Sequence, residues 1–151
     1  MSLILISHRG NISGPLAAFE NSPQYVLKAI DLGYDVEIDV WNLGDKWYLG
    51  HDSPQYLVDL EFLENPKLWC HAKNIDALSR MISNKNIRCF WHQEDDVTLT
   101  SDNYLWTYPG KIQGTKSICV MPEKFNIKIG DKIISKCAGI CSDFIEEFKK
   151  E

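Results

Sequence analysis

Short apolar runs alternate with amphipathic segments through the first half of the chain. Continuous or period-two apolar runs predict β-strands, and apolar residues at helical spacing predict α-helices. The predicted strands span residues 3–7, 34–41, 46–52, 68–73 and 87–93, and the predicted helices span residues 24–33, 55–65 and 74–85. Strands and helices that alternate in this order form parallel sheets with right-handed crossovers.

The predicted helices carry start and stop signals. Asn21-Ser22-Pro23 places a cap and an early proline before the first helix, which ends at Gly33. Pro66 ends the second helix, and Asn74 caps the third. Polar caps and an early proline are typical of helix starts, and glycine or proline is typical of helix ends.

The second half of the chain has strands but few helices. Strands are predicted at residues 103–110, 117–123 and 139–144, with one further short strand at 97–100, and helical patterns remain only at 131–137 and 145–151. The connection between two parallel strands usually takes a dozen or more residues. The segment between Pro109 and Ser117 is too short for such a connection. We therefore predict a minimal TIM-type (β/α) barrel that lacks several helices in its second half, with residues 1–151 as a single domain.

Composition and charge argue against two classes of protein, those that bind nucleic acids and those that span a membrane. The chain has 151 residues, of which 44% are hydrophobic and 25% charged, and its net charge is −5. An acidic chain with scattered lysines does not fit a nucleic-acid-binding surface. No apolar run is long enough to span a bilayer, and the first apolar run does not resemble a signal peptide.

The five cysteines are widely spaced, which does not suggest a disulfide framework. They are Cys70, Cys89, Cys119, Cys137 and Cys141, and three of them lie in apolar runs that predict strands. The last two lack a second pair to form a zinc site. We expect five reduced thiols, buried as small hydrophobic groups, in a cytoplasmic protein.

Polar residues follow the predicted strands, at the edge where parallel α/β barrels build their sites. Glu37 and Asp39 are two residues apart on one strand, so both carboxylates point to the same side. If both point into the barrel, a bound divalent metal ion relieves their repulsion. The alternative is the opposite register, with both carboxylates on a solvated face.

The motifs at these strand ends resemble those of the glycerophosphodiester phosphodiesterases, which are TIM barrels that cleave phosphodiesters with a divalent metal ion. The matching segments are HRG at 8–10, EN at 20–21, VEIDV at 36–40, GHD at 50–52, CHAK at 70–73 and AGICSD at 138–143. The resemblance is strong over residues 5–52, moderate at 68–73 and 138–143, and weak from 92 to 131.

The resemblance implies roles for four residues. His8 and His51 match the two catalytic histidines that act as general acid and base. Arg9 and Lys73 match the cations that bind the phosphate oxygens of the substrate. The alternatives are a core histidine at position 8, a turn histidine at position 51, and ordinary surface cations at the other two positions.

The chain departs from this family at the third metal ligand, where His71 replaces a carboxylate. Imidazole suits zinc or manganese better than calcium, so the identity of the single divalent ion (Mg²⁺, Mn²⁺, Ca²⁺ or Zn²⁺) stays open. Glu94 is the alternative third ligand, with Asp95 beside it, although both belong to an acidic run typical of a solvated loop.

We therefore expect a metal-dependent enzyme that hydrolyses a small phosphodiester, with no nucleic-acid partner and no integral membrane association. The alternatives are a sugar-phosphate isomerase or epimerase and a non-catalytic phosphodiester-binding protein. Because helices are lacking between residues 92 and 131, the apolar runs there predict an exposed patch. We expect a second copy of the chain to cover this patch in a two-fold dimer.

Overall fold

The computed structural model describes residues 2–149, which form a mixed α/β fold. Its strands are β1 (Ile4–His8), β2 (Asp35–Leu43), β3 (Lys46–Leu49), β4 (Tyr56–Val58), β5 (Leu68–Ala72), β6 (Cys89–Phe90), β7 (Val97–Leu99), β8 (Leu105–Thr107), β9 (Ser117–Val120) and β10 (Gly139–Ser142). Its α-helices are α1 (Pro23–Asp31), α2 (Leu60–Leu63) and α3 (Ile75–Ile82), and its 3₁₀-helices are η1 (Pro122–Phe125), η2 (Ile134–Lys136) and η3 (Ile145–Phe148).

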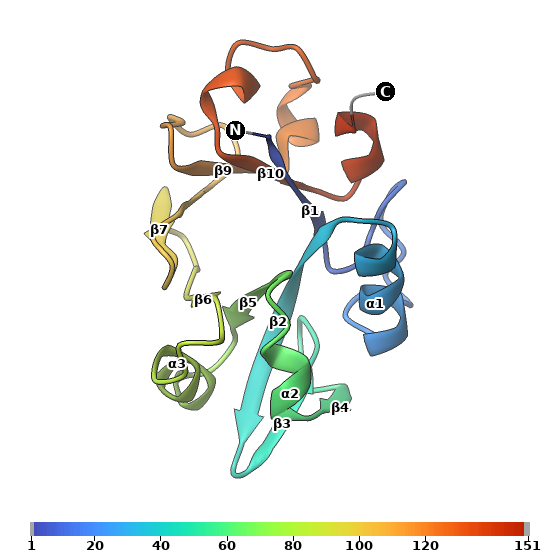
Figure 1. The fold of residues 1–151 in the computed structure, drawn as a ribbon, viewed down its shortest axis with the longest axis vertical. Coiled ribbons are helices and arrows are strands. Elements are labelled where there is room, and N and C mark those ends of the chain that lie inside the picture. The colour runs from blue at the N-terminus through green and yellow to red at the C-terminus, as the bar shows by residue number, and fades with distance from the viewer. Residues whose placement is uncertain (1, 150–151) are drawn as a thin grey trace.

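The strands form one curled sheet (Figure 1). Its parallel part runs in the spatial order β6, β5, β2, β1, β10, β9, β8. The antiparallel strands β3 and β4 extend the far end of β2, and β7 pairs antiparallel with β8. Among the described residues, β6 pairs only with β5, so no strand ladder closes the curl into a full barrel.

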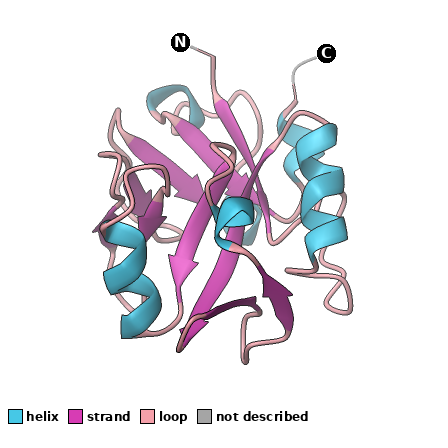
Figure 2. Cartoon of the chain, turned by 60° about the horizontal axis from the view of Figure 1, so that its bottom comes forward, coloured by secondary structure: helices cyan, strands magenta, loops and turns pink. Residues whose placement is uncertain are grey.

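Helices α1 and α3 form where the sequence predicts them and pack on the outside of the curl (Figures 1 and 2). The Ser22 side chain caps α1 by accepting a hydrogen bond from the Tyr25 backbone. The Asn74 side chain caps α3 in the same way, through the backbone N–H of Ala77. Both predictions are confirmed because each segment combines a polar cap with one apolar face.

The helix predicted over residues 55–65 is wrong in its first half, and only the turn Leu60–Leu63 of this span is helical. Residues Tyr56–Val58 form the antiparallel strand β4, in which Leu57 is exposed while its two neighbours pack against the core. Such alternation is typical of a strand. The leucines around it also fit helical spacing, so the sequence predicted a helix here. The Asp59 side chain then caps the single helical turn of α2.

The second half is less regular than predicted. The strand expected over 87–93 is reduced to β6, and the strand expected at 97–100 forms as β7. The helix predicted at 131–137 is the 3₁₀ turn η2, and the one predicted at 145–151 is the 3₁₀ turn η3, with residues 150–151 outside the described part. These segments are too short to bury a full helical face, so tertiary packing fixes them only as single turns.

Side chains along β2 point alternately to the two sides of the sheet, and this determines where the carboxylates of Glu37 and Asp39 lie. Val36, Ile38 and Val40 are fully buried between the sheet and the helices. Glu37 and Asp39 therefore point to the opposite side, into the curl, and both are buried as well. The alternative of a solvated face is excluded.

Large side chains fill the rest of the interior of the curl. Trp69, Phe90 and Trp106 stack there, with 4.5 Å between the Phe90 and Trp106 ring centroids. The five cysteines are free thiols, and all except Cys137 are buried. No helix within residues 2–149 is long and apolar enough to cross a membrane.

Candidate functional site

The carboxyl ends of three adjacent strands bring the predicted site residues together. Strand β1 ends in His8, which lies beside Glu37 of β2 in the parallel ladder. Farther along β2, Asp39 lies beside His71 of β5. These register pairs place one histidine on each side of the β2 carboxylates.

Glu37, Asp39 and His71 form a compact group of potential metal ligands. One ligand atom from each lies within 4.8 Å of the others. His71 Nδ1 is 3.6 Å from a Glu37 oxygen and 3.3 Å from an Asp39 oxygen. Ligand atoms around an ion with bonds of about 2.1 Å stand roughly 3–3.5 Å apart, so these separations suit a divalent metal ion.

The carboxylates leave two buried oxygens without hydrogen-bond partners. Glu37 Oε2 and Asp39 Oδ1 are inaccessible to solvent and accept no hydrogen bond, although His8 Nε2 lies 3.7 Å from the first and His71 Nδ1 lies 3.3 Å from the second. Leaving a buried charged acceptor unpaired costs at least about 1–3 kcal/mol, and native proteins rarely keep such atoms. A cation between these oxygens would satisfy both, so the residues present fit a bound metal ion.

His71 is held in the orientation that a metal ligand needs. Its Nε2 donates a hydrogen bond to the backbone carbonyl of His92 at 2.9 Å, which turns Nδ1 toward the carboxylates. Such outer hydrogen bonds are typical of metal-binding histidines. Burial alone would lower the pKa of His71, but the neighbouring Asp39 and Glu37 outweigh it and raise the pKa to about 9.

Asn21 holds the Asp39 carboxylate in place. Its side chain accepts a hydrogen bond from the Asp39 backbone and donates one to Asp39 Oδ2, both at 2.9 Å. Burial opposes the charged form of Asp39, yet the neighbouring rings of His51 and His71 and the charge of Arg9 keep its pKa well below the usual value. Asp39 is therefore ionised, with Oδ1 directed toward the cluster.

His8 is paired with a carboxylate from the last strand of the sheet. Its Nδ1 donates to Asp143 at 2.7 Å, and Asn11 donates to the same Asp143 oxygen at 2.8 Å. The other ring nitrogen, Nε2, lies 3.7 Å from Glu37 Oε2. Burial lowers the pKa of His8, but the hydrogen bond to Asp143 and the negative charge of Glu37 together outweigh it, and the net shift is upward.

Arg9 connects the second histidine to the cluster. Its guanidinium lies 2.6 Å from His51 Nδ1, 3.0 Å from Asp39 Oδ2 and 3.3 Å from Glu20. Because a guanidinium only donates, His51 Nδ1 accepts this bond and its proton sits on Nε2. The His51 side chain is 43% exposed, so this ring faces the open side of the site.

Of the remaining predicted residues, Lys73 reaches the cluster and Glu94 does not. Lys73 Nζ lies 3.8 Å from Asp39 Oδ1. Glu94 is exposed and is absent from the potential ligand group found within the described residues. The third position beside Glu37 and Asp39 is occupied by His71.

Four residues of the site had no catalytic, phosphate-binding or metal-ligand role in the sequence predictions: Asn11, Glu20, Asn21 and Asp143. Glu20 and Asn21 belong to the EN segment, and Asp143 ends the last strand-like run. The only indication in the sequence that these four residues belong to the site is that they lie within or next to the matching motifs. Their partners are as many as 135 residues away in sequence, so spacing alone could not assign them.

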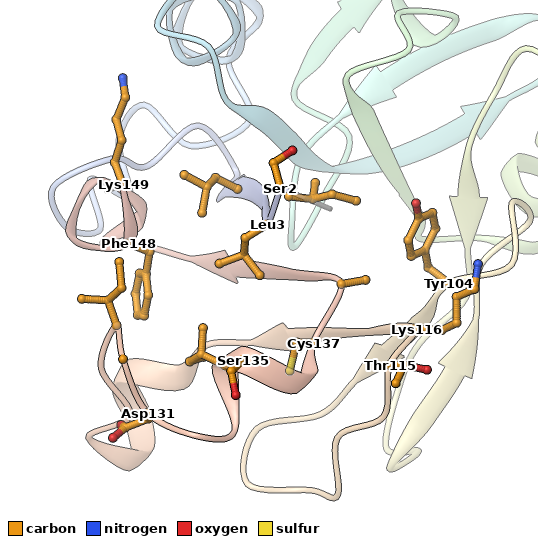
Figure 3. A pocket seen from close by; sticks show the side chains of 16 residues that line it. Ser2, Leu3, Tyr104, Thr115, Lys116, Asp131, Ser135, Cys137, Phe148 and Lys149 are labelled. Atoms are coloured by element: carbon orange, nitrogen blue, oxygen red, sulfur yellow. The ribbon is translucent and has the colours of Figure 1, made fainter. Parts of the chain in front are cut away.

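A large hollow lies at the other end of the sheet. It measures about 1310 Å³ and is lined by Leu3 before β1, Tyr104 before β8, Cys137 before β10 and Phe148 of η3, among others (Figure 3). None of the four histidines lines it. The residues predicted for the catalytic and metal site therefore lie away from this hollow.

Comparisons of the chain with protein-family models, with curated proteins and with solved structures find no match. The resemblance to glycerophosphodiester phosphodiesterases therefore stands on the motifs and on the residues that the fold gathers. What these residues can do is a question of their chemistry and geometry.

Proposed function

We propose that this protein is a metal-dependent phosphodiesterase whose catalysis is similar to that of the glycerophosphodiester phosphodiesterases. One observation carries the proposal. The buried group Glu37, Asp39 and His71 has unpaired carboxylate oxygens and is flanked by His8 and His51. A cation site between two imidazoles suits phosphodiester cleavage, which needs charge stabilisation together with a general acid and a general base.

Glu37, Asp39 and His71 would hold one divalent ion, which acts as a Lewis acid toward phosphoryl oxygens when bound. Arg9 and Lys73 would bind the non-bridging oxygens, since both cations already lie within 4 Å of Asp39. Arg9 can offer a planar pair of donors, whereas Lys73 acts as a point charge. The substrate phosphate would then displace part of the ion pairing that Arg9 makes with Glu20.

The two histidines have environments that suit opposite roles. The pairing of His8 with Asp143 raises its pKa, which favours the imidazolium form that protonates a leaving alkoxide. His51 has a lone pair on Nδ1, now bonded to Arg9, and this nitrogen can accept a proton from the attacking hydroxyl or water once Arg9 turns to phosphate. One proton is thus taken from the nucleophile and one is given to the leaving group.

The proposal extends to the fold, which we interpret as a reduced barrel. The parallel strands follow one another around the curl in chain order, as in a (β/α) barrel. Hydrogen bonds bridge the gap beside β6, from the Ser101 backbone to the Cys89 carbonyl at 2.8 Å and from Thr98 Oγ1 to the Trp91 carbonyl at 2.7 Å. The free thiols support a reducing compartment such as the cytoplasm.

A metal titration followed by a phosphodiesterase assay tests the proposal and its alternatives. We expect Mn²⁺ to bind and a phosphodiester such as glycerophosphocholine to release its alcohol only in the presence of the metal. A sugar-phosphate isomerase would bind metal but release no alcohol from any diester. A non-catalytic binding protein would bind the metal and the diester without turnover, and either result would overturn the proposal.

A further inference from the structure

The loop between β1 and α1 carries a fully buried amide, that of Asn11. Its bond to Asp143 is one of four hydrogen bonds that this side chain makes. Four is the full capacity of a primary amide, which has two N–H donors and two acceptor lone pairs. A buried amide with every donor and acceptor paired is held in a single orientation.

The partners of Asn11 identify its oxygen and its nitrogen. The Leu16 backbone N–H and the Tyr25 hydroxyl both lie 3.1 Å from Oδ1 and donate to it. The two partners of Nδ2 are carboxylate oxygens, which only accept: Asp143 Oδ1 at 2.8 Å and Glu20 Oε1 at 2.9 Å. The amide therefore shapes its own loop through the oxygen and holds two carboxylates through the nitrogen.

Each of these carboxylates also binds a residue with a proposed role in catalysis. Asp143 Oδ1 accepts a hydrogen bond from His8 Nδ1 at 2.7 Å, and Glu20 Oε2 accepts one from Arg9 at 3.3 Å. Among the side chains of residues 2–149, only that of Asn11 bonds to both carboxylates. One amide thus connects the proposed general acid to the proposed phosphate-binding guanidinium.

The backbone of Asp143 is fixed without Asn11. Its N–H donates to Glu123 Oε1 at 3.0 Å, and its carbonyl accepts from the Gly14 N–H at 2.9 Å. Asn11 therefore controls the direction of the side chain alone. Because both carboxylates bond to the same nitrogen, they lie close together, and without its N–H groups their like charges would turn them apart.

We propose that Asn11 is a positioning residue that aligns the general acid and the phosphate-binding arginine of the site with one amide group. Through Asp143 it fixes the ring of His8, and through Glu20 it steadies the guanidinium of Arg9. None of its four bonds goes to a proposed metal ligand. This proposal rests on the phosphodiesterase function proposed above.

The test compares Asn11→Asp with Tyr25→Phe on the Mn²⁺-loaded protein, with glycerophosphocholine as the substrate. Asn11→Asp keeps the oxygen that shapes the loop and replaces the two donors with an acceptor. Its kcat should fall by about 10- to 100-fold, because a misplaced general acid reacts poorly. Tyr25→Phe is the matched control, since it removes one bond to the same side chain and keeps both donors, and its kcat should stay within about twofold of the wild-type value.

A second background separates positioning from general damage. In an Asp143→Ala protein, adding Asn11→Asp should lower kcat by less than about threefold, because the group through which Asn11 acts on His8 is then absent. An undiminished fall in this background would overturn the proposal. So would a fall in Tyr25→Phe as large as that in Asn11→Asp.

The Nδ1 proton of His8 gives a readout that does not need turnover. A ring N–H bonded to a carboxylate at 2.7 Å has a far-downfield NMR signal. This signal should be present in the wild type and in Tyr25→Phe and lost in Asn11→Asp, and its persistence in Asn11→Asp would overturn the proposal. If the wild type does not cleave the diester, the phosphodiesterase function fails and this comparison alone decides whether Asn11 positions His8.

Circular dichroism checks that each variant is folded. If Asn11→Asp does not fold, Asn11→Ser takes its place in both the kinetic and the NMR comparison, because a serine hydroxyl donates only one hydrogen bond and cannot hold both carboxylates. The same outcomes then support or overturn the proposal.

Discussion

At the scale of single residues, His71 is the position where a proton and a metal ion would compete in the proposed metal site. Its Nδ1 faces two carboxylates, which raise the pKa of the ring to about 9 in the metal-free protein. Because the folded-state pKa lies above the unfolded one, this group stabilises the metal-free fold fully below about pH 6.5. That contribution is lost as the pH rises through about 9.

The competition predicts how metal binding depends on pH. A metal ion must displace the His71 proton, so apparent affinity for Mn²⁺ should rise about tenfold per pH unit between pH 7 and pH 9 and then level off. Calorimetric titration at several pH values measures this slope. An affinity that does not change over this range would mean that His71 is not a ligand, and His71→Gln should abolish the dependence.

The two flanking histidines give a second prediction at this scale. His8→Ala and His51→Ala should each lower turnover by roughly 10²- to 10⁴-fold, because each removes a proton donor or acceptor. Metal affinity and the urea midpoint of unfolding should change little, since neither residue is a metal ligand. Steady-state kinetics on a phosphodiester measures the effect. Near-normal turnover in either variant would remove that residue from the mechanism.

At the scale of elements, the helices and strands that the sequence predicts correctly are those whose apolar positions fit a single period. Helices α1 and α3 have a capping side chain and one apolar face, and both form as predicted. Residues 35–40 of β2 alternate between polar and apolar, so the inward direction of Glu37 and Asp39 could be predicted as well. Over residues 55–65 the apolar positions fit both helical spacing and strand alternation. Residues Tyr56–Val58 form a strand because they pair with β3. The partnership of His8 with Asp143 depends on β10 lying beside β1, which no local pattern reveals.

The turn after β3 yields a prediction about how the backbone positions His51, a proposed catalytic residue. Gly50 precedes His51 with φ of +152°, and a Cβ there would overlap the Ser53 backbone carbonyl oxygen. Gly50→Ala should therefore shift the turn, displace His51 and reduce turnover by about 10-fold or more. Kinetics and urea denaturation together measure the two effects.

Gly44→Ala is the matched control for this turn. Gly44 also has a positive φ, of +62°, but a Cβ there has open space. This variant should lose about 1 kcal/mol of stability through backbone strain while its turnover stays close to the wild-type value. Equal losses of turnover in the two variants would contradict the positioning of His51 by Gly50.

At the scale of the whole molecule, the side of the sheet between β6 and β9 lacks the outer helices that cover β2 and β5. The apolar side chains of the runs at 103–110 and 117–123, from which the sequence predicts an exposed patch, are mostly buried or half-buried, with Trp106, Ile118 and Cys119 in the core. The exposed apolar side chains on this side are instead Val97, Leu99, Tyr108 and Ile112, with Leu99 at 63%. We expect a second copy of the chain to cover this patch in a two-fold dimer. Light scattering at micromolar concentration should give twice the chain mass, and Leu99→Lys should shift the protein toward monomer. A clean wild-type monomer would contradict this expectation.

The measurement that bears most directly on the proposed metal centre is a calorimetric titration with Mn²⁺ of the wild-type protein and of Asp39→Asn and Glu37→Gln. We predict about one ion bound per chain in the wild type, and binding weakened by at least about 100-fold in each variant, because each loses an anionic ligand. Circular dichroism confirms that the variants stay folded. A wild-type protein that binds no divalent ion, or variants that bind it as tightly as the wild type, would contradict a metal site at Glu37, Asp39 and His71.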